Sequence, residues 1–105
     1  MDVVVNLSAS DFSKKIVTDK TAVIIDVRTP QEFNDDHIPN SMLIDIYNQN
    51  FQNDIMELDK NKNYYVYCRS GNRNYHAGNF MLSQGFEKVH HLQKGILSWN
   101  EKLEK

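Results

Sequence analysis

One short segment of this sequence combines the residue types of a reactive thiol: Cys68-Arg69-Ser70-Gly71-Asn72-Arg73. Cys68 ends an apolar run, and a polar loop with one glycine leads from it into a helical pattern that begins at Asn72. Backbone N–H groups at the start of a helix favour an anion, and so do the guanidinium groups of two nearby arginines. Both effects favour the thiolate over the thiol, so we expect Cys68 to be a nucleophile.

A lone cysteine at the end of a strand is more often a small buried apolar side chain than a reactive group. The neighbours of Cys68 favour chemistry, because a packed core requires neither two arginines nor a mid-loop glycine beside the sulfur. Cys68 is the only cysteine, so it has no partner for an internal disulfide and no cysteine cluster offers a zinc site. We expect no metal and no cofactor.

The charges of the chain are divided unequally, although the net charge is only −2. Residues 1–59 carry 11 carboxylates and 4 basic side chains, whereas residues 60–105 carry 3 carboxylates and 8 basic side chains. Residues 60–86 contain no Asp or Glu, and Cys68 lies within them. This pattern favours an anionic ligand at the sulfur, although it can equally reflect an Asn-rich and Tyr-rich composition. Nucleic acid is a weaker candidate, because the chain is acidic overall and has no cluster of five or more basic residues.

Length and composition describe one globular domain. A chain of 105 residues with 40% hydrophobic and 25% charged side chains is close to the average for such domains. No apolar run approaches the roughly 20 residues that cross a bilayer, and the first residues lack the pattern of a secretory signal. We expect a single domain over residues 1–105, located in the cytoplasm, without a membrane or nucleic-acid partner.

Buried-strand patterns alternate with helical patterns along the chain. Strands are expected at residues 3–5, 22–27, 42–44, 64–68 and 89–92, and helices at residues 8–17, 30–33, 50–58, 72–84 and 94–103. Strands that alternate with helices form a parallel sheet with both faces covered. Ligands of such sheets bind beyond the carboxyl ends of the strands, which is where Cys68 would lie.

Three segments of the chain together resemble the single-domain rhodaneses, which are thiosulfate sulfurtransferases. Residues 68–73 resemble the active-site loop of that family. Residues 26–33 and 37–41 resemble its first signature, an Asp-Val-Arg run that leads to a His-Ile-Pro turn, and residues 85–99 resemble its last. The three segments occur in the family's order and span nearly all of residues 8–103.

The resemblance implies a rhodanese-like α/β fold, with a central five-stranded parallel sheet and helices on both faces. It also implies that Cys68 takes sulfane sulfur from a small anionic donor such as thiosulfate, holds it as a persulfide, and passes it to cyanide or a thiol. The acceptor thiol can belong to a partner protein. In this picture the loop holds the persulfide with its amides and orients the donor with its two arginines, and its residues are Arg69, Ser70, Gly71, Asn72 and Arg73.

Two alternatives to free sulfur transfer remain. The first is a persulfide carrier, or binding module, that delivers sulfur to a partner protein. The second is a Cys-dependent phosphatase or arsenate reductase, whose loop has the spacing Cys-x5-Arg. Here the spacing is Cys-x4-Arg, and Asn74 occupies the position of that arginine. The shorter loop fits a single sulfur better than a tetrahedral oxyanion, so sulfur transfer is favoured.

The first signature also supplies supporting residues. Arg28 and Glu32 are four residues apart, and we expect them to form an ion pair. Asp26 either steadies the active-site loop by accepting hydrogen bonds or serves as a cap or turn residue. Asn40 and Ser41 replace the usual Gly and Ala of the turn, and Asn tolerates the positive φ that such a turn requires.

Three histidines are expected to be structural. His37 is expected to brace the turn that follows the first signature. His90 and His91 are adjacent on an expected strand, so their side chains point to opposite faces and make poor co-ligands for a metal.

Overall fold

The computed structural model describes residues 4–105 and contains a five-stranded parallel sheet with the strand order β1-β5-β4-β2-β3. This arrangement confirms the predicted fold class. The strands are β1 (Val5–Leu7), β2 (Ala22–Asp26), β3 (Met42–Leu43), β4 (Asn63–Tyr67) and β5 (Val89–Leu92). The helices are α1 (Ala9–Thr18), α2 (Pro30–Asp35), α3 (Phe51–Met56), α4 (Asn72–Ser83) and the 3-10 helix η1 (Ile96–Ser98).

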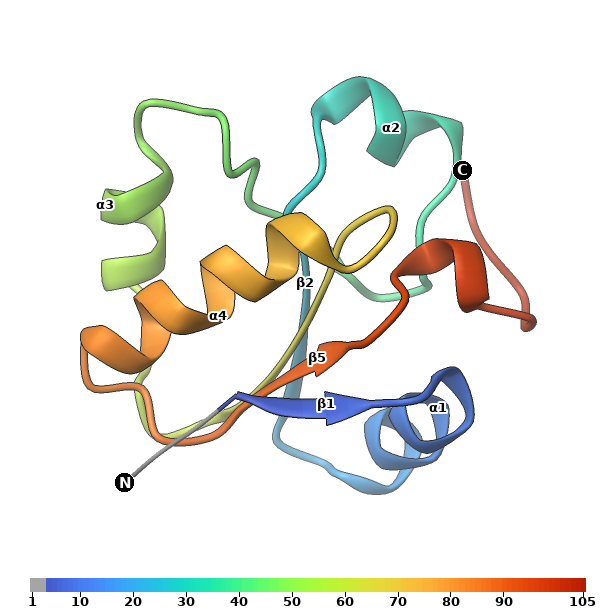
Figure 1. The fold of residues 1–105 in the computed structure, drawn as a ribbon, viewed down its shortest axis with the longest axis horizontal. Coiled ribbons are helices and arrows are strands. Elements are labelled where there is room, and N and C mark those ends of the chain that lie inside the picture. The colour runs from blue at the N-terminus through green and yellow to red at the C-terminus, as the bar shows by residue number, and fades with distance from the viewer. Residues whose placement is uncertain (1–3) are drawn as a thin grey trace.

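The sheet separates two hydrophobic layers, because successive side chains of a strand point to opposite faces. Tyr64 and Val66 of β4 pack with residues of α3 and α4, whereas Tyr65 and Tyr67 pack with Phe12 of α1. Figure 1 shows α3 and α4 on one side of the strands and α1 with the C-terminal segment on the other. β4 lies between β2 and β5, so the chain leaves the middle of the sheet at Cys68.

Capping residues place most helix ends close to the predicted positions. The Ser8 side chain accepts a hydrogen bond from the backbone of α1, and Thr29 and Glu32 form a complete capping box at the start of α2. Gly85, with φ of +93°, follows the end of α4. Asn40 has φ of 70°, so it adopts the left-handed conformation that the turn requires.

Three predicted elements differ from the structure. The first strand was predicted at residues 3–5, but β1 lies at Val5–Leu7, and residue 3 lies outside the described residues. α3 is shorter than predicted, because the Leu58 N–H donates to the Ile55 carbonyl and closes a tight turn. The prediction of a helix over residues 94–103 is wrong, since only Ile96–Ser98 are helical.

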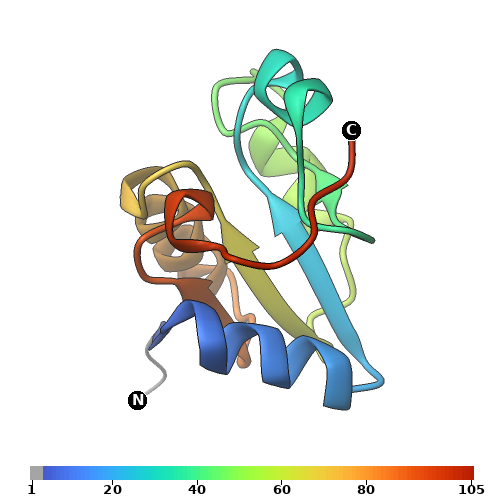
Figure 2. The same cartoon turned by 90° about the vertical axis from the view of Figure 1, so that its right-hand side faces the viewer.

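Backbone hydrogen bonds to other parts of the chain hold the C-terminal segment in place. The Ile96 and Leu97 N–H groups donate to the carbonyls of Cys68 and Arg69, at 2.8 and 3.1 Å. Further on, Glu104 and His37 exchange two backbone hydrogen bonds, at 2.7 and 2.8 Å. Figure 2 shows the consequence, which is that the C-terminal turn lies beside the loop that precedes α4.

Within residues 4–105 no helix is both long and apolar enough to span a bilayer.

Candidate active site

Cys68 follows the last residue of β4 and stands at the carboxyl edge of the sheet, as predicted. The strand is held on both sides, by β2 and β5, and this pairing fixes where the sulfur lies. The residue is 1% exposed, so the thiol lies beneath the loop rather than on its surface. Loop residues 69–71 then connect β4 to α4.

The loop packs backbone against backbone on the segment that follows β5. A Cβ atom on Gly71 would lie 2.1 Å from the carbonyl oxygen of Gln93, and one on Gly95 would lie 2.3 Å from that of Arg69. Both glycines also have positive φ, +104° and +65°. Any side chain at either position would push the two segments apart, so the two glycines set the shape of the loop around the sulfur.

Three groups define the surroundings of the Cys68 sulfur. The Gly71 N–H donates to Sγ at 3.1 Å, which is the one loop amide that bonds it among the described residues. The thiol in turn donates to Oδ1 of Asn74 at 2.8 Å. The Nδ2 group of Asn74 then lies 2.6 Å from Nδ1 of His91, so the sulfur, the amide and the imidazole form one chain of contacts.

Sequence analysis missed Asn74 and His91 as neighbours of the sulfur. Asn74 was noted only as the position of an absent arginine, and His91 only as a strand residue. Asn74 lies in the first turn of α4, and His91 is paired with Val66 across the sheet, so both meet Cys68 only in the folded chain. Asn74 lies six residues after Cys68, in the first turn of the predicted helix, so the predicted helix start was the signal for it, whereas His91 required the strand order and register.

The two loop arginines have different surroundings. Arg73 donates two hydrogen bonds to the carboxylate of Glu32 in α2, at 2.7 and 2.9 Å. This bond lowers the pKa of Glu32 to about 2. The same bond is the main cause that raises the pKa of Arg73, and the Glu32 carboxylate balances the charge of that guanidinium. Arg69 is exposed and makes no ion pair within residues 4–105.

The predicted ion pair between Arg28 and Glu32 is wrong. Arg28 instead forms an ion pair with Asp26, in which Arg28 Nη2 lies 2.8 Å from Asp26 Oδ2. Both side chains are almost fully buried. Spacing of four residues brings side chains together only inside a helix, and Arg28 lies before the N-cap of α2. Asp26 also accepts from the Arg28 N–H, so its role is that of a turn residue and ion-pair partner.

The remaining predicted residues lie around the loop or brace the fold. Ser70 and Asn72 are exposed. His37 stacks on Phe33, with ring centroids 3.9 Å apart, and its Nδ1 contacts the Phe33 carbonyl at 2.9 Å, so it braces the turn as expected.

The two adjacent histidines lie on opposite faces of β5, which confirms that prediction. His90 stacks on Tyr65 on the α1 face, whereas His91 contacts Asn74 of α4. No group of three or more His, Cys, Asp or Glu side chains is placed to hold a metal ion among the described residues.

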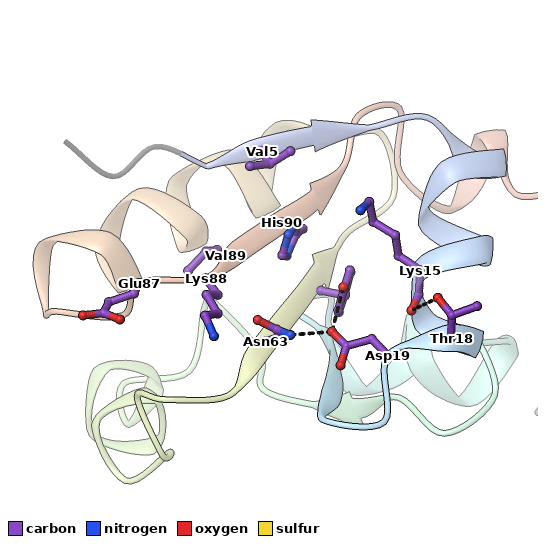
Figure 3. A pocket seen from close by; sticks show the side chains of 10 residues that line it. Val5, Lys15, Thr18, Asp19, Asn63, Glu87, Lys88, Val89 and His90 are labelled. Carbon is purple, nitrogen blue, oxygen red and sulfur yellow. Dashed lines mark hydrogen bonds between the residues drawn. The ribbon is translucent and has the colours of Figure 1, made fainter.

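Two cavities lie at opposite edges of the sheet. One, of about 310 Å³, opens beside the loop and is lined by Arg69, Glu32 and Leu97 among others. A larger one, of about 540 Å³, lies between α1 and the start of β5, with Lys15 and His90 on its walls (Figure 3). The larger cavity borders the amino end of β4, and five residues of strand, roughly 16 Å, separate that end from Cys68. Of these two cavities the smaller borders the loop, through Arg69, but three carboxylates, those of Glu32, Asp35 and Asp36, also line it, and Cys68 does not.

Comparison with known proteins places the chain in a family. A family model described as the rhodanese-like domain matches residues 8–102. The thiosulfate sulfurtransferase GlpE of Pseudomonas syringae is 37% identical over 78 residues, which cover 74% of this chain and 72% of that protein. YrkF of Bacillus subtilis, a proposed sulfur carrier protein, is 33% identical over 98 residues, and the match covers 93% of this chain but only 52% of YrkF.

The fold agrees with this similarity. The crystal structure of a rhodanese-like domain protein from Staphylococcus aureus superposes with a TM-score of 0.84 at 26% identity, and covers 96% of this chain and 97% of that one. The chain therefore belongs to the rhodanese-like domain family. This similarity identifies the protein as a sulfurtransferase, a transferase whose general chemistry is sulfur transfer.

Proposed function

We propose that this protein takes sulfane sulfur from an anionic donor such as thiosulfate and passes it to cyanide or a thiol, through a persulfide on Cys68. The observation that carries the proposal is the placement of Sγ at the carboxyl edge of β4, where it accepts a hydrogen bond from the Gly71 N–H at 3.1 Å. A donor on the sulfur favours the charged forms of both the thiolate and the persulfide.

The reaction divides into two displacements at sulfur. The Cys68 thiolate attacks the outer sulfur of thiosulfate, a new S–S bond forms, and sulfite leaves with the electron pair of the bond that breaks. The acceptor then attacks the terminal sulfur of the persulfide, and the Cys68 thiolate is released. The amide of Gly71, the first turn of α4 and the charge of Arg73 stabilise the negative sulfur during both steps.

The structure of the loop favours sulfur over phosphate as the transferred group. The Cys-x5 position, which is an arginine in the phosphatase loop, is here Asn74, a neutral side chain that is fully buried and bonded to Sγ. The loop therefore lacks the arginine that completes the phosphatase loop. We expect no hydrolysis of an aryl phosphate, and steady hydrolysis would contradict this reasoning.

A thiosulfate–cyanide assay that measures thiocyanate tests the proposal directly. Cys68→Ser should abolish turnover while the protein keeps its fold, because the hydroxyl cannot form a persulfide. Turnover by Cys68→Ser at the wild-type rate would refute the mechanism.

The exposed Arg69 is proposed to attract the anionic donor toward the loop. Arg69→Ala should raise KM for thiosulfate more than it lowers kcat, since its charge acts on the approach of the anion. Lys62→Ala is the matched control, because Lys62 is exposed and lies before β4 at the opposite edge of the sheet. Equal KM values for the two variants would refute the role of Arg69.

Delivery of the persulfide to a protein thiol is a second candidate function, and the surface around the loop favours it. Three large apolar side chains flank the loop and are exposed, Tyr47 by 69%, Tyr75 by 49% and Leu97 by 62%. The Tyr47 ring lies against the Arg73 guanidinium, and the Leu97 N–H bonds to the Arg69 carbonyl. Exposed apolar groups around a reactive atom are typical of a site that docks another protein.

Mass spectrometry of the protein as purified distinguishes the two candidates. An adduct of one sulfur atom on Cys68, together with negligible thiocyanate formation, would favour the carrier. Rapid turnover with thiosulfate and cyanide would favour the free enzyme.

A further inference from the structure

Two buried polar side chains behind the sulfur, Asn74 and His91, have no part in the transfer steps described above. Asn74 is 0% exposed and His91 is 6% exposed. Two successive hydrogen bonds connect them to the nucleophile: Cys68 Sγ–H donates to Asn74 Oδ1, and Asn74 Nδ2–H donates to His91 Nδ1. A buried series of polar side chains is stable only where each polar group has a hydrogen-bond partner in its neighbour.

The orientation of the Asn74 amide fits a neutral thiol and no other state of Cys68. The amide oxygen accepts the thiol proton at 2.8 Å. A thiolate has lost that proton, and so has a persulfide at Sγ, so in either state the partial negative charge of Oδ1 would face an electron-rich sulfur. The reaction therefore requires the amide to change its orientation.

A half-turn of the Asn74 amide exchanges its donor and acceptor without moving the backbone. Nδ2–H would then donate to the sulfur, beside the Gly71 N–H that already does so. The oxygen would then face His91 Nδ1, which must carry a proton to donate to it. A neutral imidazole meets that demand when its proton moves from Nε2 to Nδ1, with no change of charge.

We propose that Asn74 and His91 are positioning residues of the sulfur-transfer reaction, in which the amide turns to donate to the ionised Cys68 sulfur while His91 exchanges the Nε2–H tautomer for Nδ1–H. This inference rests on the proposed persulfide chemistry of Cys68. It requires His91 to remain neutral, and burial favours that form by lowering the pKa of His91. Two ionisable side chains of α4 flank Asn74 in the sequence: Arg73, which is paired with Glu32, and Tyr75, whose ring lies 6.3 Å from that of His91.

The tautomer of His91 is the direct test. Protein labelled with ¹⁵N-histidine is examined by nuclear magnetic resonance, and His91→Phe assigns the signal. Across a pH titration of the reduced protein we expect the Nε2–H tautomer while Cys68 is a neutral thiol and the Nδ1–H tautomer once it is ionised, and we expect Nδ1–H after loading with thiosulfate. Cys68→Ser keeps its hydroxyl proton and should show Nε2–H throughout. The same tautomer in every state of the wild-type protein would overturn the proposal.

Reactivity of the thiol gives a second measurement, because alkylation by iodoacetamide follows the thiolate fraction. Asn74→Leu has nearly the same shape but no donor, and should alkylate about tenfold more slowly at neutral pH, the equivalent of one charge-assisted hydrogen bond. His91→Phe should also slow alkylation, and the double variant should be no slower than Asn74→Leu alone. His90→Phe is the matched control, since His90 faces the other side of β5, and it should alkylate at the wild-type rate.

The two hypotheses fail separately in these experiments. Absence of thiocyanate formation with a normal tautomer change in the pH titration would refute the proposed function alone. Normal turnover with an unchanged tautomer, or additive effects of Asn74→Leu and His91→Phe on alkylation, would refute the positioning role alone.

Discussion

The ion pair between Glu32 and Arg73 joins α2 to the active-site loop, and Glu32→Gln isolates its contribution to stability. Gln at this position can still accept the cap hydrogen bond from Thr29, because a capping box accepts either Glu or Gln. The substitution therefore removes the charge of Glu32 and leaves the start of α2 intact.

The pKa of Glu32 sets the expected magnitude. The hydrogen bond with Arg73 lowers it from 4.5 to about 2, and each unit of pKa is worth about 1.36 kcal/mol, so the upper limit is about 3 kcal/mol. The two side chains are 27% and 20% exposed, and solvent screens them in part. We therefore expect Glu32→Gln to lower the free energy of unfolding by about 1–2 kcal/mol at pH 7.

The sign of the pH dependence follows from the lowered pKa. A carboxylate whose pKa is lower in the folded protein stabilises it above the unfolded value, here 4.5, and the stabilisation is lost as the pH falls toward about 2. Urea denaturation at successive pH values, followed by the fluorescence of Trp99, measures the difference between variant and wild type. The difference should be largest at neutral pH and should shrink below pH 4.5.

Asp36→Asn is the control for this measurement. The Asp36 carboxylate lies 3.7 Å from Arg28 and is 46% exposed, so its removal should cost less than about 0.5 kcal/mol. Equal stability of Glu32→Gln and wild type at pH 7 would refute the reasoning, and so would a difference that persists unchanged in acid.

Three further substitutions test the packing that supports the site. Gly95→Ala brings a Cβ to 2.3 Å from the Arg69 carbonyl oxygen, and should cost about 3 kcal/mol in urea denaturation and reduce kcat for sulfur transfer. Asp26→Asn leaves the Arg28 charge buried without a counter-ion, and should lower the free energy of unfolding by about 3–5 kcal/mol; a change within error would contradict the buried pair. Asn40→Ala should destabilise by about 1 kcal/mol in thermal unfolding, because φ is 70° there, whereas Asn40→Gly should be at least as stable as wild type.

Elements that depend on neighbours in the sequence were predicted closely. The run of apolar and aromatic residues at 64–68 predicted β4, which the structure places at Asn63–Tyr67. Ser8 and the pair of Thr29 with Glu32 carry their own hydrogen-bond partners within three residues, so their helix starts are visible in the sequence.

The C-terminal segment shows where such patterns mislead. Ile96, Trp99 and Leu103 have helical spacing, yet only Ile96 lies in a helix, and the other two reach the same hydrophobic layer from the non-helical chain that follows. The spacing of apolar residues indicates which side chains face the same hydrophobic layer. A segment that is held by hydrogen bonds to other parts of the chain can turn those side chains toward the layer without forming a helix. Here the outside partner is His37, whose backbone exchanges two hydrogen bonds with Glu104.

The sequence by itself determined the alternation of strands and helices, and the loop that follows Cys68 at the carboxyl edge of the sheet. Both depend on periodicity and on interactions over a few residues. The tertiary structure alone decided the partners of that loop. Arg73 meets Glu32 across 41 residues of chain, and Asn74 meets His91 across 17. Strand order and helix packing select such contacts, which hold the groups around the sulfur, whereas the two groups that bond Sγ directly, the Gly71 N–H and Asn74 Oδ1, lie within six residues of Cys68.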